Sequence, residues 1–77
     1  MFRYEICNQA DNGIFEKQCL ALEKNIPDLI RQKRLQDVDG SETQLYRLKQ
    51  YDVRVHNSMY LNEVYIESGI DLTQYFG

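Results

Sequence analysis

The first residues alternate between apolar and polar side chains. Phe2, Tyr4 and Ile6 fall on one side of an extended chain, and Cys7 falls on the opposite side. A period of two is typical of a strand with one buried face. Polar and turn-forming residues over 8–13 then interrupt the alternation. The pattern predicts a strand that ends near residue 7.

An apolar stripe with helical spacing follows this turn. Four residues share one face of a helix at intervals of four, three and four: Phe15, Cys19, Leu22 and Ile26. Lys17, Gln18 and Lys24 occupy other faces, as in a helix with one side in water. Pro27 disfavours the helical conformation at the residue before it. The pattern predicts a helix over residues 13–25.

Residues 29–36 fit neither period well. Interpreted as a helix, they give only a weak apolar stripe, and interpreted as a strand they place Leu35 inward beside two cations. The dipeptide Asp39-Gly40 favours the strand, because it tolerates the positive φ angles of a two-residue type I′ hairpin turn. We therefore expect a strand over 31–38 paired with one over 42–49, with Arg34 opposite Leu45.

Two further segments alternate near the end of the chain. Tyr51, Val53 and Val55 alternate with polar residues, and a tight turn at Asn57-Ser58 leads into a last strand. The order is then β-α-β-β-β-β. One helix on a three- to five-stranded, mainly antiparallel sheet is an α+β two-layer sandwich. At 77 residues, the chain 1–77 makes a single domain.

The small size and the single helix both favour self-association. A chain this short has a small core, and one helix covers only one face of a sheet. We therefore expect a homodimer or a larger assembly. The sequence has no apolar run of about 20 residues that would cross a bilayer and no apolar signal segment at its start. These features predict a cytoplasmic protein that does not contact a membrane.

The net charge of −3 conceals an uneven distribution. No Lys or Arg follows residue 57, so the last third is acidic and is suited to a basic protein partner. The middle of the chain is mildly basic. Four residues form a predicted basic stripe on the strands, with His56 beside it: Arg34, Arg47, Lys49 and Arg54. Such a stripe could hold nucleic acid phosphates, although an isoelectric point near 5.0 disfavours that function.

The sequence contains few groups suited to catalysis. Cys7, Cys19 and His56 supply residue types of a nucleophilic site, but Cys19 lies on the buried helical stripe, where a thiol is inert. The spacing of these three residues is unlike that of a zinc site. We expect a protein that is not an enzyme and that has no catalytic residue, metal or cofactor. A ligand-binding or enzymatic site around Cys7 and His56 at a subunit interface is one alternative.

Tyrosine provides the strongest indication of binding. Tyrosine is enriched at protein interfaces because it combines apolar area with a polar tip. Four tyrosines are expected on the sheet face that the helix leaves uncovered: Tyr46, Tyr51, Tyr60 and Tyr65. The sequence thus predicts a small binding module. Its expected partner is a second copy of the chain or a different protein, and nucleic acid binding through the basic stripe is the alternative.

Overall fold

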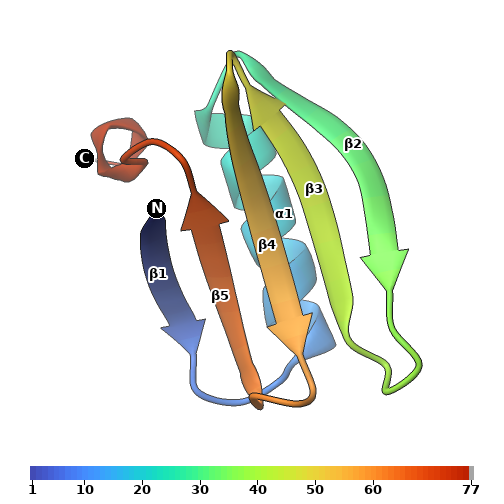
Figure 1. Ribbon diagram of the computed structural model, residues 1–77. Helices are drawn as coiled ribbons and strands as arrows, with labels where there is room; N and C mark the ends of the chain where they lie inside the picture. The colour runs from blue at the N-terminus through green and yellow to red at the C-terminus, as the bar shows by residue number, and fades with distance from the viewer. Residues whose placement is uncertain (77) are drawn as a thin grey trace.

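The computed structural model describes residues 1–76, which form one α-helix packed on a five-stranded antiparallel sheet (Figure 1). The elements are β1 (Phe2–Cys7), α1 (Asn12–Asn25), β2 (Leu29–Gln36), β3 (Glu42–Leu48), β4 (Tyr51–Ser58), β5 (Glu63–Ser68) and a short 3₁₀ turn, η1 (Thr73–Tyr75). The strand order is β1-β5-β4-β3-β2. The expected α+β two-layer sandwich is confirmed. Within residues 1–76, no helix has the length and apolarity needed to cross a membrane.

The core lies between α1 and the sheet face that it covers. The predicted apolar stripe of the helix is confirmed, since Phe15, Cys19, Leu22 and Ile26 are at most 1% exposed. Burial of each large apolar side chain contributes about 1.5–3 kcal/mol. The helix begins after Asp11, whose carboxylate accepts a hydrogen bond from the Ile14 amide at 2.9 Å. That bond satisfies one of the amides left free in the first turn.

The ambiguous segment 29–36 is a strand, but its hairpin differs from the prediction. The Asp37 amide donates to the Ser41 carbonyl, and Gly40 donates to the Asp37 carbonyl. Gly40 has a φ of 91°. This is a three-residue loop with a glycine in the left-handed region, not a two-residue turn. Arg34 therefore lies opposite Gln44 rather than Leu45, and β2 ends at Gln36.

A bulge in β2 between Arg31 and Arg34 shifts the register a second time. Beyond it, Arg31 lies opposite Tyr46. A shift of one residue moves a side chain to the other face of a sheet. Both arginines consequently face α1, while Leu35, expected inward, lies opposite Thr43 on the uncovered face.

A bulge also occurs in β1, between Glu5 and Cys7. Cys7 lies opposite Val64, a fully buried residue of β5, and packs against the core. The expectation that Cys7 lies on the face opposite Ile6 is wrong, because both side chains pack against the core. The extra residue of the bulge is the physical reason.

Candidate functional site

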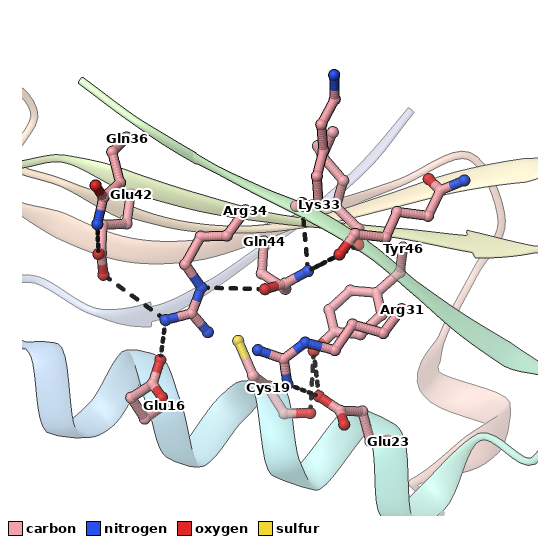
Figure 2. A network of polar contacts seen from close by, with 12 residues as sticks. Glu16, Cys19, Glu23, Arg31, Lys33, Arg34, Gln36, Glu42, Gln44 and Tyr46 are labelled. Carbon is pink, nitrogen blue, oxygen red and sulfur yellow. Dashed lines mark hydrogen bonds and ion pairs between the residues drawn. The ribbon is translucent and has the colours of Figure 1, made fainter.

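Arg34, predicted to belong to an outward basic stripe, lies between β2 and the helix (Figure 2). Its Nε donates to Gln44 Oε1 at 3.0 Å, and its Nη1 lies 2.7 Å from Glu16 Oε1 on α1. The guanidinium carbon also lies 4.9 Å from the centroid of the Phe15 ring. Through these contacts, Arg34 connects the edge strand β2 to the helix α1.

Gln44 holds the bulge of β2 in place. Its side chain is 1% exposed, and its Nε2 donates to the carbonyls of Gln32 at 2.7 Å and Lys33 at 3.3 Å, which are the two residues of the bulge. A bulge removes residues from the strand ladder, so their carbonyls need another donor. Gln44 supplies that donor.

Tyr46 lies on the covered face of the sheet, so its expected place on the uncovered face is wrong. It is 1% exposed, and its hydroxyl donates to Glu23 Oε2 at 2.6 Å (Figure 2). Arg31 Nη1 reaches the same carboxylate oxygen at 2.9 Å. Burial, reinforced by the bonded Glu23 carboxylate, raises the pKa of the Tyr46 hydroxyl. Tyr46 is a core residue with a polar anchor on the helix.

The other three tyrosines do not form one surface. Tyr51 is half-buried at the start of β4, on the same face as Val53, and packs next to Gly69. Tyr60 is 89% exposed in the loop 59–62, because the turn expected at Asn57-Ser58 comes later in the chain. Only Tyr65 lies on the uncovered face of a strand. The predicted tyrosine-rich sheet face is not formed.

The predicted basic stripe is not formed either. Arg47 and Arg54 lie on the uncovered face, where Arg47 contacts Asp52 at 2.5 Å and Arg54 lies 3.8 Å from Glu67. Lys49 is in the turn between β3 and β4, with a φ of 57°. Arg34 is on the opposite face. The four cations therefore do not line up along one strand pair.

The uncovered face carries a hydrogen-bonded chain centred on His56. Thr43 Oγ1 lies 3.0 Å from His56 Nδ1, and His56 Nε2 lies 2.8 Å from Glu67 Oε1. The Tyr65 ring stacks on the imidazole with centroids 4.5 Å apart. Burial lowers the pKa of His56 below its usual value, so the ring is neutral at pH 7. A carboxylate only accepts, so Nε2 carries the proton and Nδ1 accepts from Thr43.

The hydrogen-bonded series Thr43, His56 and Glu67 has the order of a nucleophilic hydroxyl, a base and an orienting acid. Catalysis of that kind also needs donors for an oxyanion, usually backbone amides. β3 and β4 each have a paired strand on both sides, so their amides are engaged in the ladder. Cys7 packs against the core while His56 lies on the uncovered face, so a single chain does not bring these two residues together. Among residues 1–76, no three potential ligands are grouped to hold a metal ion.

Two loops meet at one end of the sheet, at the bottom of Figure 1: residues 37–41 and 59–62. The Met59 amide donates to Ser41 Oγ at 2.8 Å, which joins them. Four exposed apolar side chains lie on these loops: Val38, Met59, Tyr60 and Leu61. Val38 and Tyr60 are almost fully in water. A sequence signal existed for these residues, since large apolar residues are unusual at turn positions.

Acidic groups lie beside these apolar side chains. A hollow of about 150 Å³ beside it is lined by Asp37, Asp39 and Glu42 together with Tyr60, and its lining within the described residues contains no Lys or Arg. Hydrogen bonds from Ser41 hold the pKa of the Asp39 carboxyl below its usual value. Asp37 and Asp39 make no ion pair within residues 1–76. We call Val38, Met59, Tyr60 and Leu61 with Asp37 and Asp39 the acidic loop end.

The function of this surface has to be inferred from its chemistry. Comparison of the chain with protein-family models, with curated protein sequences and with solved structures finds no match in any of the three.

Proposed function

We propose that the protein is a small, non-enzymatic binding module that holds a basic protein partner at the acidic loop end. The observation that carries this proposal is the group of four exposed apolar side chains on two joined loops with unpaired carboxylates beside them. Exposed apolar clusters with a polar rim mark interaction sites. Tyr60, 89% exposed, is the expected anchor, since tyrosine is enriched among residues that dominate binding energy.

Charge selects the partner. Asp37 and Asp39 lie beside the exposed apolar side chains without a cation to neutralise them in the described part of the chain. A partner with Lys or Arg around an apolar contact complements this surface. The same carboxylates repel phosphate groups, so a basic protein suits the surface better than nucleic acid does.

Local hydrogen bonds connect the residues of both loops in the unbound chain. The Ser41 amide donates to Asp39 Oδ1 at 2.9 Å, and the Leu61 amide donates to Ser58 Oγ at 3.0 Å. Together with the bond between Met59 and Ser41, these contacts fix both loops through short local bonds. Binding then costs little conformational entropy, because the surface already has its shape.

The test compares the wild-type chain with variants as baits for partner capture, followed by calorimetry with the purified partner. Tyr60→Ala and the double variant D37K/D39K should each weaken binding at least tenfold, about 1.4 kcal/mol. Leu20→Ala is the matched control, because Leu20 is 64% exposed on the helix, away from the loops. Affinity for the true partner should also fall as salt rises. A purified partner that binds the wild type, Y60A and D37K/D39K equally well contradicts the proposal.

A further inference from the structure

The two edges of the sheet differ in how they could receive another strand. β1 and β2 are the edge strands, and an edge presents unpaired N–H and C=O groups. Both strands have a bulge, but β2 carries three cations, Arg31, Lys33 and Arg34, and no acidic residue. Two copies of β2 would bring cations against cations. Within residues 1–76, no strand covers the outer edge of β1.

The sequence of β1 is complementary to itself in the antiparallel direction. When two copies are paired about Tyr4, Arg3 of one lies opposite Glu5 of the other, and the two-fold axis repeats that pair. Phe2 lies opposite Ile6, the residue at the bulge of β1, in the same register. Opposite charges and apolar residues facing each other across strands both stabilise a pairing. No such match exists along β2.

An apolar hollow of about 230 Å³ lies directly beside this edge. Its walls come from β1, β5, α1 and the segment around η1, and include Tyr4, Ile6, Leu22, Ile66, Leu72 and Phe76. An apolar cavity of about 150 Å³ already holds a benzene molecule. The hollow therefore has room for one aromatic ring, and Ile6, which would face Phe2 of a second copy, forms part of its wall.

The hollow is formed within a single chain. The Leu72 amide donates to the Tyr4 hydroxyl at 2.8 Å, and that hydroxyl donates to Asp71 Oδ1 at 2.9 Å. These bonds fasten the segment that carries Leu72 to β1. Phe2, the residue that would enter the hollow of a second copy, is 45% exposed in the isolated chain.

We infer that a second copy of this chain pairs with β1 at its free edge, in antiparallel register about Tyr4. The two sheets join into one, with both helices on the same side, because opposed residues in paired strands share a face. Phe2 of each copy fills the apolar hollow of the other. This surface is separate from the acidic loop end, so the homodimer and the hetero-partner site succeed or fail independently.

Charge variants test the register. Glu5→Arg places two arginines opposite each other, and Arg3→Glu places two glutamates opposite each other. Each variant alone should raise the dimer dissociation constant at least about tenfold, measured by sedimentation over a dilution series. An equimolar mixture of E5R and R3E should restore a dimer, since each cation then faces an anion. Asp28→Arg, the same change of charge at an exposed position in the connection before β2, is the control.

The apolar contact has its own test. Phe2→Ala should weaken the dimer at least about tenfold, whereas Tyr60→Ala should leave it unchanged. Arg3 also pairs with Glu63, so circular dichroism is used to check that R3E folds. If R3E does not fold, the two single variants E5R and F2A still test the inference. A wild-type chain that stays monomeric at millimolar concentration overturns the inference. So does a dimer that E5R and F2A leave intact.

Discussion

Replacing Gln44 by leucine removes the amide that holds the bulge of β2 while keeping a side chain of similar size. The change deletes the bonds from Nε2 to the carbonyls of Gln32, Lys33 and Leu45 and the bond that Oε1 accepts from Arg34. Because the Gln44 side chain is 1% exposed, water does not enter its position to replace these bonds. The rest of the fold keeps its contacts.

The expected cost follows from the number of lost bonds. Each hydrogen bond contributes about 1 kcal/mol, and a buried group left without a partner costs about 1–3 kcal/mol. The apolar side chain of leucine buries additional apolar area, which offsets about 1 kcal/mol of the lost stability. Water still reaches the exposed side of β2, which lowers the penalty on the two carbonyls. The free energy of unfolding should therefore fall by about 2 kcal/mol, and the melting temperature by about 10 °C.

Urea denaturation monitored by circular dichroism measures this loss, and amide hydrogen exchange locates it. Protection should fall in β2 and at the adjoining part of β3 more than in β5. Gln36→Leu is the control, because the Gln36 amide bonds only the Glu42 carboxylate at an exposed position. That variant should cost less than about 0.5 kcal/mol. A Q44L protein as stable as the wild type would refute the role assigned to Gln44.

Three further changes test other parts of the structure. Because burial lowers the pKa of His56, the unfolded chain takes up a proton at a higher pH than the folded chain does, and the free energy of unfolding should fall as the pH drops below 6.5. A His56→Gln variant should lose this pH dependence in urea titrations. Tyr46→Phe should cost about 1–3 kcal/mol by the same measurement, because its hydroxyl bonds the Glu23 carboxylate. The raised pKa of Tyr46 also means that the wild type should lose stability above pH 10, and Y46F should lose less. Gly40→Ala should cost about 1 kcal/mol in thermal unfolding, since a φ of 91° is unfavourable for alanine.

The local elements could be predicted because each depends on neighbours in the sequence. Apolar and polar side chains alternate over residues 2–6 because one face of the strand is buried. The apolar stripe from Phe15 to Ile26 follows the helical period over fewer than four turns. Asp39-Gly40 indicated the hairpin, since glycine tolerates the positive φ of the loop. These are properties of short segments, so the order of elements and the α+β sandwich followed from the sequence.

The candidate site could be predicted only in part. The sequence predicts Tyr60 as a binding residue, and it lies in the acidic loop end. Val38, Met59 and Leu61 were missed, because their exposure depends on where the turns begin. The 59–62 loop begins two residues later than the expected turn, and that shift moved Tyr60 from a strand to a loop.

The faces of the sheet were decided by the tertiary structure alone. One additional residue in the hairpin loop turned Arg34 inward, where Gln44 and Glu16 hold it, and the bulge turned Arg31 inward. The Tyr46 hydroxyl donates to Glu23 on the helix, a residue 23 positions away in the chain. A strand has a period of two, so a slip of a single residue exchanges its two faces. The sequence by itself determined which segments become strands and helix. Long-range contacts determined the register, and with it which charged and aromatic residues meet water.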